Sequence, residues 1–459
     1  MTVTAGRYDV ICRDGTLGPL LTALFLARTG KRVLVLPPRL VETGTGEFLL
    51  PVVSHGAAGL LAEADLLTAD VLLPAANWFR LFSGKGEFSC PADRDARQEA
   101  FAASCRPVSS WWRALLASSQ ALGRRLEEAL SSAMMVPPLG LRDYGRMIGL
   151  LAADRELLEK RQLDWASFLQ SSGLDEGRRE FFLSLPVLMS QFNYAHLPYL
   201  SVAYGLHTWS AAARLVDLDQ LQRRLREQLR LQGAEFADRD CEIIFDGKWY
   251  IGIGTEGRVA CRSGIFVGAA DRERLELEIR PLDRRRDFFR QFDHREAGYR
   301  LYRLTWPTAD AGERDSEATG AGYFFPPAAG AGEVPAWQPR RLDGGAGRRP
   351  ATFSWLQPAG QPPAGDAAAA TLAACCRVMG VNKPAAVDWQ TQIENGAAGP
   401  LRGCRPRLAP VLGGAFLPVT GIYQRFYHVG WENLPGFGLN GLIWSARKTA
   451  DHALASAYL

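Results

Sequence analysis

The stretch YDVICRDGTLGPLLTALFLARTGKRVLVLPPR, residues 8–39, decides the fold. Its apolar start over residues 8–13 predicts a strand, and its leucines recur at helical spacing over residues 17–29. Gly30 is placed to end that helix, and the continuous apolar run KRVLVL is typical of a buried strand. Strand, helix and strand in so short a span predict a parallel βαβ unit at the start of the chain.

The bulk composition describes a globular chain without a strong charge preference. The 459 residues exceed a single simple core and predict two or more domains, and 47% are hydrophobic with a net charge of +4. Arginine clusters at residues 223–226 and 284–286 are interpreted as solvated faces, so nucleic acid is not expected as a partner. The eight cysteines form no CxxC pair, which favours reduced thiols and no metal site.

Two later segments extend the α/β pattern. VDLDQLQRRLREQLRLQG, residues 216–233, predicts an amphipathic helix, and CEIIFDGKWYIGIG, residues 241–254, predicts a hairpin around an Asp-Gly turn. RVACRSGIFVGAAD, residues 258–271, predicts further strands. Residues 100–210 are mostly helical in pattern, with Trp111 and Trp112 expected to pack. The Ala/Gly/Pro-rich residues 308–370 are interpreted as long loops or poorly ordered insertions, with the strand-like pieces RLYRLTWP, residues 300–307, and ATFSWLQP, residues 351–358, around them.

The last block, GAFLPVTGIYQRFYHVGWENLPGFGLNGLIWSARKTADHAL, covers residues 414–454. A strand is expected at Phe426–Val429, followed by a glycine-rich turn and a helix from about Leu439. Free N–H groups point outward at such a helix start, so the turn is a natural site for an anion or a carbonyl oxygen.

These three blocks, in this order, resemble the FAD-dependent phytoene desaturase and carotenoid isomerase group of the amine-oxidase-like flavoproteins. The resemblance covers residues 7–37, 214–271 and 411–456 well, and it implies FAD as the cofactor. It also implies contacts of the cofactor with the first turn, with the strand that brackets the adenine, and with the last turn. The positions concerned are Asp14, Gly15, Thr16, Gly18, Cys241, Gly430, Gly436, Gly438 and Leu439.

The chain departs from the family at the half of the site that holds ADP. The three glycines of the family's G-x-G-x-x-G turn fall on Asp14, Thr16 and Pro19, and Gly15 and Gly18 do not substitute in register. The first glycine permits the tight turn, the second lets the backbone reach the pyrophosphate, and the third lets helix pack on strand. Where an acid should bind the ribose, Pro37 offers neither a carboxylate nor an N–H. The four losses together argue against ordinary FAD binding.

The predicted fold is therefore α/β, with a Rossmann-like FAD/NAD(P)-binding domain interleaved with an α+β substrate-type domain. The dinucleotide-binding domain is expected from three pieces, a helical lid or substrate region follows the first piece, and a substrate-type domain precedes the last. The boundaries in that order are 1–85, 86–210, 211–275, 276–410 and 411–459, of which 86–210 and 276–410 are the inserted regions.

No side chain is singled out as catalytic. His428 lies on the last strand and could face a flavin, and His207 lies ahead of the middle block, but packing in the core is the favoured interpretation for both. Tyr423, Arg425 and Tyr427 alternate along one strand and could line a cleft. Cys404 has no surroundings that support a covalent flavin link.

Three hypotheses follow. The favoured one is a noncatalytic relative that serves as a binding or partner subunit, with an apolar small molecule or a protein as its partner. The second is an active FAD-dependent desaturase or isomerase acting on an apolar polyene or lipid-like substrate. The third is a different ligand in the old groove. The apolar run at residues 17–27 is too short to span a bilayer, so we expect a cytoplasmic protein with at most peripheral contact at the inner membrane face.

Overall fold

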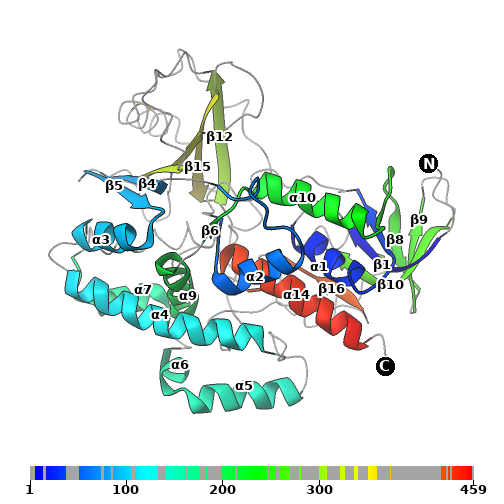
Figure 1. The fold of residues 1–459 in the computed structure, drawn as a ribbon, viewed down its shortest axis with the longest axis horizontal. Coiled ribbons are helices and arrows are strands. Elements are labelled where there is room, and N and C mark those ends of the chain that lie inside the picture. The colour runs from blue at the N-terminus through cyan, green and yellow to red at the C-terminus, as the bar shows by residue number, and fades with distance from the viewer. Residues whose placement is uncertain are drawn as a thin grey trace.

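The computed structural model describes the chain in separate stretches. The described residues are 6–13, 17–37, 51–73, 77–83, 86–104, 109–132, 141–160, 163–175, 179, 182, 198–211, 214–246, 248–254, 259–268, 279–280, 299–307, 321–325, 335–339, 350–358, 373, 425–430, 433–434 and 437–456. Figure 1 shows two sheets with helices packed between and beside them.

The larger sheet has eight strands and carries the predicted βαβ unit. Its order is β11-β8-β9-β10-β1-β2-β7. The eighth strand, β16, pairs with the C-terminal end of β10, beyond the part that pairs with β9. The strands are β1 (Gly6–Arg13), β2 (Val33–Leu36), β7 (Glu235–Phe236), β8 (Glu242–Phe245), β9 (Tyr250–Ile253), β10 (Val259–Gly268), β11 (Ile279–Arg280) and β16 (Phe426–His428). β1 runs parallel to β2 and β10, and β10 runs parallel to β16, so the α/β prediction is confirmed.

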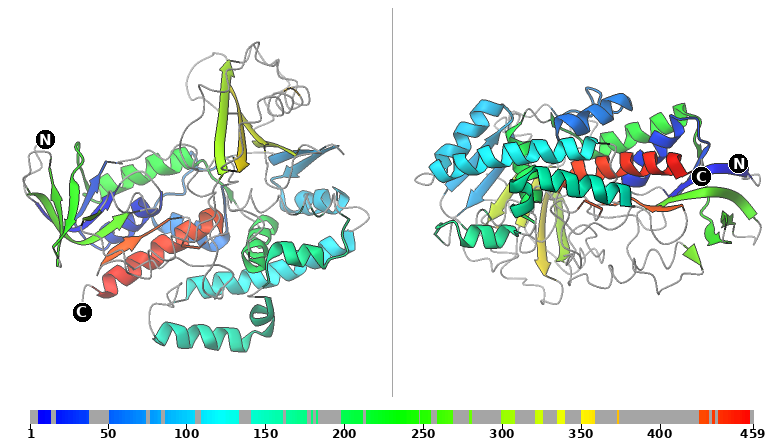
Figure 2. Two further views of the ribbon diagram at one scale, coloured as in Figure 1. Left: turned by 180° about the vertical axis from the view of Figure 1, so that it is seen from behind. Right: turned by 90° about the horizontal axis from the view of Figure 1, so that it is seen from below.

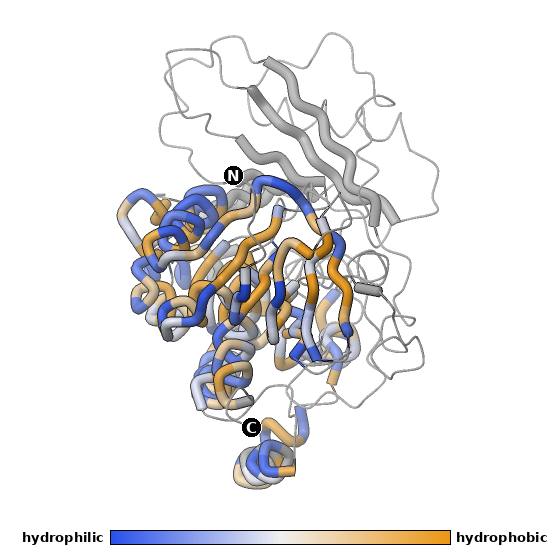
Figure 3. The backbone as a smooth tube through the Cα atoms, turned by 90° about the vertical axis from the view of Figure 1, so that its right-hand side faces the viewer, coloured by the Kyte–Doolittle hydropathy of each residue, from blue (hydrophilic) through white to orange (hydrophobic). Residues whose placement is uncertain are grey.

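The two faces of this sheet are buried against different partners. Val10 and Val35 belong to the main core, whereas Ile11 and Leu34 belong to a second cluster with residues of β8 to β10. This alternation is the period of two that a strand imposes, and burial on both faces explains the continuous apolar run of β2. In Figure 3 the hydrophobic colour follows the strands of this sheet.

Three helices far apart in sequence cover one face of the sheet. α1 (Leu17–Ala27) contacts both α10 (Leu218–Leu231) and α14 (Gly438–Ser456). Every residue of α1 is buried, as expected for a helix enclosed by a sheet and two other helices. Gly30, with a φ of +83°, ends the turn after α1 in the left-handed region, as predicted. Figure 2 shows α14, in red, beside the blue N-terminal elements.

The smaller sheet has six strands in the order β12-β15-β14-β13-β4-β5. They are β4 (Asn77–Ser83), β5 (Gly86–Pro91), β12 (Tyr299–Pro307), β13 (Ala321–Phe325), β14 (Pro335–Pro339) and β15 (Pro350–Pro358). The prediction of loops within residues 308–370 is therefore wrong for β13 and β14, whereas β12 and β15 coincide with the two expected strand-like pieces. Pairing with β4 and with one another overrides the composition, and the prolines of β14 stand at its first and last positions, where a missing N–H is tolerated.

The described residues between 94 and 210 are largely helical, as predicted from about residue 100 onward. The helices are α3 (Arg94–Ser104), α4 (Ser109–Ser131), α5 (Leu141–Ala153), α6 (Arg155–Lys160), α7 (Trp165–Gln170) and α9 (Tyr199–Ser210); α2 (His55–Glu63) lies earlier, after the short β3 (Val52–Val53), which pairs with β6 (Arg214–Leu215). Trp112 is buried against Phe182 with ring centroids 5.2 Å apart, and Trp111 packs on the same core. Over the described part of the chain, none of the helices combines the length and apolarity needed to cross a bilayer.

Candidate functional site

The carboxyl ends of the parallel strands form one edge of the larger sheet, where open α/β sheets bind their ligands. β1 ends at Arg13 and β2 at Leu36, and both are followed by segments that the resemblance assigns to FAD. Asp14, Gly15 and Thr16 lie outside the described residues. The description of the edge therefore rests on Arg13, on Pro37 and on the segment that precedes β8.

Arg13 joins the ends of three chain segments. Its side chain is only 6% exposed, and it forms an ion pair with Asp240. One guanidinium nitrogen donates to the Pro37 carbonyl oxygen at 3.2 Å, and the other donates to the Cys241 carbonyl oxygen at 3.4 Å. We call this arrangement the Arg13 clamp. It fastens the end of β1 to the residue after β2 and to the start of β8.

The clamp is supported on its acidic side as well. Asp240 accepts a hydrogen bond from the Cys241 backbone N–H at 2.7 Å, and this bond orients the carboxylate that pairs with the guanidinium. A buried guanidinium needs such a charged partner together with oxygen acceptors for its other N–H groups. The clamp supplies both. Its acceptors are the backbone carbonyls of Pro37 and Cys241, two positions that the resemblance assigns to the adenosine half of FAD.

Gly18 is required by the close approach of α1 to the end of β16. A Cβ at this position would lie 2.6 Å from the Val429 carbonyl oxygen and 2.9 Å from a methyl carbon of Leu442. Gly18 therefore has a packing role of its own, and its register against the family glycines stays a prediction.

The turn after β16 is closed by its own side chains. The Gly430 N–H donates to the Asn433 side-chain oxygen at 2.6 Å, and the Asn433 amide donates to the His428 carbonyl at 3.1 Å. His428 itself is buried, with 1% exposure, in agreement with the packing interpretation. Gly438 has a φ of +56°, which glycine adopts at no steric cost, and it begins α14. Gly436 lies outside the described residues.

Leu439 and Asn440 show what the first turn of α14 does. Leu439 is buried in the main core, with 1% exposure. The Asn440 side chain accepts the Ser54 N–H at 2.8 Å and donates to the Val52 carbonyl at 3.1 Å. The start of α14 is therefore fastened to β3 and to the residue that caps α2.

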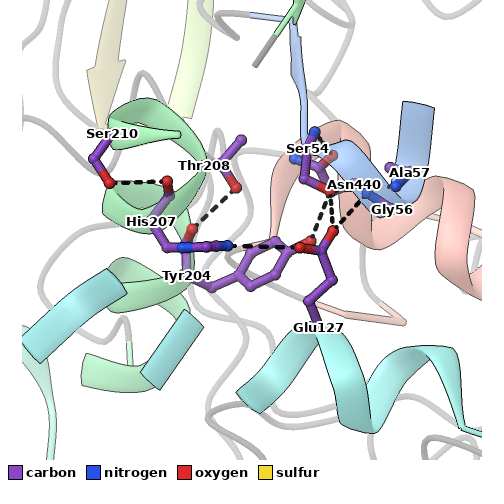
Figure 4. A network of polar contacts seen from close by, with 9 residues as sticks. All are labelled: Ser54, Gly56, Ala57, Glu127, Tyr204, His207, Thr208, Ser210 and Asn440. Atoms are coloured by element: carbon purple, nitrogen blue, oxygen red, sulfur yellow. Dashed lines mark hydrogen bonds and ion pairs between the residues drawn. The ribbon is translucent and has the colours of Figure 1, made fainter. Parts of the chain in front are cut away.

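A buried polar network lies next to this contact (Figure 4). The Glu127 carboxylate, from α4, accepts the Ser54 hydroxyl and, at 3.0 Å, the Gly56 N–H of α2. The other Glu127 oxygen lies 3.5 Å from the Nε2 atom of His207 on α9. The Tyr204 hydroxyl donates to the Ser54 oxygen at 3.4 Å. The network places one carboxylate at the N-terminus of α2, where the helix dipole favours it.

Burial acts to raise the pKa of Glu127, but hydrogen bonds from His207, Ser54 and the Gly56 N–H outweigh burial and lower that pKa. Burial also raises the pKa of the Tyr204 hydroxyl, which stays protonated as a donor. Because Glu127 stands between Ser54 and His207, the histidine does not contact the hydroxyl, and the arrangement lacks the order of a nucleophile activated by a base. The network is built to hold α2, α4, α9 and α14 together.

The remaining predicted residues divide as follows. His207 is almost buried and faces Glu127, whereas the Tyr427 hydroxyl lies 3.3 Å from a ring nitrogen of His452. Tyr423 and Cys404 lie outside the described residues. Among the described residues, no group of three or more His, Cys, Asp or Glu side chains is placed to hold a metal ion.

Sequence reasoning missed Arg13, Asp240 and Glu127. A signal existed for Arg13, since a charged residue that ends a buried apolar strand needs a partner. Glu127 carried no such signal, because it sits on an amphipathic helix whose neighbours are about seventy residues or more away in sequence.

Comparison with known proteins places the fold. No protein-family model matches the chain, and no curated protein matches it. Among solved structures, cyclohexylamine oxidase from Brevibacterium oxydans IH-35A is similar with a TM-score of 0.56 and 14% identity, covering 98% of this chain and 100% of its own. A triple mutant of putrescine oxidase, made to redesign cofactor binding, gives a TM-score of 0.54 at 14% identity, with 98% and 99% covered. An oxidoreductase from Methanosarcina mazei gives 0.52 at 12% identity, with 96% and 99% covered.

The chain therefore has the amine-oxidase-like fold over nearly its whole length. This confirms the amine-oxidase-like part of the resemblance at the level of fold. The phytoene desaturase and carotenoid isomerase branch, the domain boundaries and the fate of FAD binding stay predictions.

Proposed function

We propose that this protein is a noncatalytic member of the amine-oxidase-like fold class, which has lost ordinary FAD binding and acts as a binding or partner subunit. The Arg13 clamp is the observation that carries the proposal. It binds the carbonyl oxygens of Pro37 and Cys241, and no carboxylate stands at position 37 to take a ribose. The described residues do not fit the adenosine half of FAD.

The magnitude is sufficient to matter. A hydrogen bond to a charged group contributes about 1.5–3 kcal/mol, so loss of the two that a ribose carboxylate makes costs about 3–6 kcal/mol. At about 1.4 kcal/mol for each factor of ten, this weakens binding by roughly two to four orders of magnitude. If FAD had to displace Arg13 from the clamp, the cost in binding free energy would be larger still, because Asp240 and Arg13 would each lose an ionic partner.

The groups at the flavin end are also used within the protein. The Gly430 N–H is bound by Asn433, and the Asn440 amide is bound by Ser54 and Val52. The glycine-rich turn thus has a structural reason to persist without a cofactor. This supports the view that the turn closes the fold.

Purified protein should show no flavin absorption bands, and the fluorescence of added FAD should stay unchanged as the protein is titrated into it. Two variants are compared. Arg13→Ala removes the clamp, and the control Arg28→Ala removes an exposed ion pair with Asp65. A modest gain of FAD binding in Arg13→Ala alone would support the clamp as the obstacle. Stoichiometric flavin in the unaltered protein would refute the proposal and favour an active desaturase or isomerase on an apolar polyene, the second hypothesis.

A further inference from the structure

Two cysteines from separate segments meet over one glycine of the larger sheet. Gly252 lies on β9, paired with Cys261 on β10 and with Ile243 on β8, and Cys241 directly precedes β8. A Cβ at Gly252 would lie 2.4 Å from the Cys261 sulfur and 2.7 Å from the Cys241 sulfur. The two sulfur atoms fill the place that a side chain at Gly252 would take.

This convergence brings the two thiols into mutual reach. The two distances from a common point leave the sulfur atoms at most about 5 Å apart. Cys241 is 6% exposed and Cys261 1% exposed, both within the smaller hydrophobic cluster, and neither forms a disulfide in this structure. A glycine inside a strand weakens it, so close approach of other atoms is the usual reason for one.

The surroundings make Cys261 the more acidic of the two thiols. The Cys241 S–H group lowers the pKa of Cys261, burial raises it, and the Gly252 N–H and Arg13 lower it further, with a lowered pKa as the net result. The pKa of Cys241 is raised, first because it donates to Cys261, then because of burial and the charges of Cys261 and Asp240, although Arg13 opposes this. In such a pair the more acidic thiol is the one expected to react first with an oxidant, and the other is placed to resolve it.

We propose that Cys241 and Cys261 form a redox site that closes to a disulfide when hydrogen peroxide oxidises it. The Cys261 sulfur attacks one peroxide oxygen, the O–O bond breaks, and a sulfenic acid and a hydroxide form. The Cys241 sulfur then attacks the Cys261 sulfur and displaces a second hydroxide. The hydroxides take up the two thiol protons, so two thiols and one peroxide give one disulfide and two waters.

The site is coupled to the Arg13 clamp through the backbone. Arg13 binds the carbonyl of Cys241 and the carboxylate of Asp240, so a disulfide at Cys241 would tie this clamp segment to β10. The disulfide does not depend on the proposed function, because it requires only the two sulfurs. Flavin titration and peptide mapping therefore test the two proposals separately.

Peptide mapping of the full-length protein tests the site. The protein is treated with a small excess of hydrogen peroxide and is then denatured in the presence of N-ethylmaleimide, which blocks the remaining thiols. It is digested with trypsin without reduction. Cleavage after Arg239, Lys248, Arg258 and Arg262 releases one peptide for each cysteine, Asp240–Lys248 and Val259–Arg262. The expected product is the linked pair, two hydrogens lighter than the sum of the peptides and separated by dithiothreitol. Both peptides carrying maleimide after peroxide treatment, with Cys90 oxidised as readily, would overturn the proposal.

Two variants sharpen the test. Gly252→Ala adds a methyl group against both sulfurs and should abolish the linked pair, whereas Gly264→Ala on β10 meets its nearest atom at 3.6 Å and should not. Cys241→Ser leaves the Cys261 sulfenic acid without a resolving thiol, so Cys261 should advance to sulfinic acid in this variant and not in the unaltered protein. This test holds even if Gly252→Ala does not fold. A linked pair that forms equally in Gly252→Ala, or the same sulfinic acid yield with and without Cys241, would refute the inference.

Discussion

Gly18→Ala sets two known effects against each other, and the structure decides which prevails. Replacing glycine by alanine inside a helix stabilises that helix by up to about 1 kcal/mol. At Gly18 the new methyl carbon would lie 2.6 Å from the Val429 carbonyl oxygen, a backbone atom that is buried and fastened by the β16 turn. Leu442 can rotate away, but a backbone oxygen cannot.

Overpacking of this kind costs about 1–3 kcal/mol, and α1 is buried along its whole length, so it cannot shift without disturbing its other contacts. With the full helix gain subtracted, the net expectation is a destabilisation of up to about 2 kcal/mol, which lowers the melting temperature of a chain this long by up to about 2 °C. The matched control is Gly59→Ala in α2, where no atom lies within 4 Å of the new methyl carbon. This control should be neutral or should raise the melting temperature slightly.

The assay is thermal unfolding followed by circular dichroism at 222 nm, with both variants measured beside the unaltered protein. The informative quantity is the difference between the two variants, because a chain of this size does not unfold in two states and absolute free energies are not defined. Equal or higher melting temperature for Gly18→Ala than for Gly59→Ala would show that α1 has room at this position, and the packing account of Gly18 would fail.

Three further substitutions test the polar interior. Because the pKa of Glu127 is held below its ordinary 4.5, its ionisation stabilises the fold above about pH 4.5 and ceases to do so as the pH falls through the lowered value. Acid titration of Glu127→Gln should show a smaller loss of stability below that pH, and an unchanged profile would contradict the network. Arg97→Lys keeps the charge but should lower the melting temperature, since the buried guanidinium stacks at 3.7 Å on Trp78 and donates to three backbone carbonyls. Trp165→Phe should lower the melting temperature by removing the buried hydrogen bond from the indole N–H to the Phe182 carbonyl, and an unchanged melting temperature would exclude a role for that 2.9 Å bond.

Local pattern was enough to predict much of the fold. The strand at residues 8–13, the helix from Leu17 and the hairpin beyond Cys241 follow from periodicity and turn residues, and all are present. β13 and β14 were missed because pairing with distant strands, not local composition, makes them strands. Composition describes what a segment prefers alone, and a sheet can change that preference.

The candidate site was less accessible to sequence reasoning. Family motif positions identified where a cofactor would lie, but the acceptors at Pro37 and Cys241 are backbone atoms that any residue possesses. The partner of Arg13 lies 227 residues away, so no spacing rule could pair them. The convergence of Cys241 and Cys261 likewise depends on strand register, which only the folded sheet fixes.

The packing of α1 against α14 has a consequence for synthesis of the protein. Thr22 of α1 contacts the Ala446 carbonyl at 3.5 Å across 424 residues of chain, and β16 completes the sheet beside β10 only when the same late segment arrives. At about 5–20 residues per second, the ribosome needs roughly 20–80 seconds to deliver that helix after α1 has emerged. Throughout this interval the leucine-rich surface of α1 lacks its cover, so the nascent chain should depend on chaperones that shield apolar segments until translation ends.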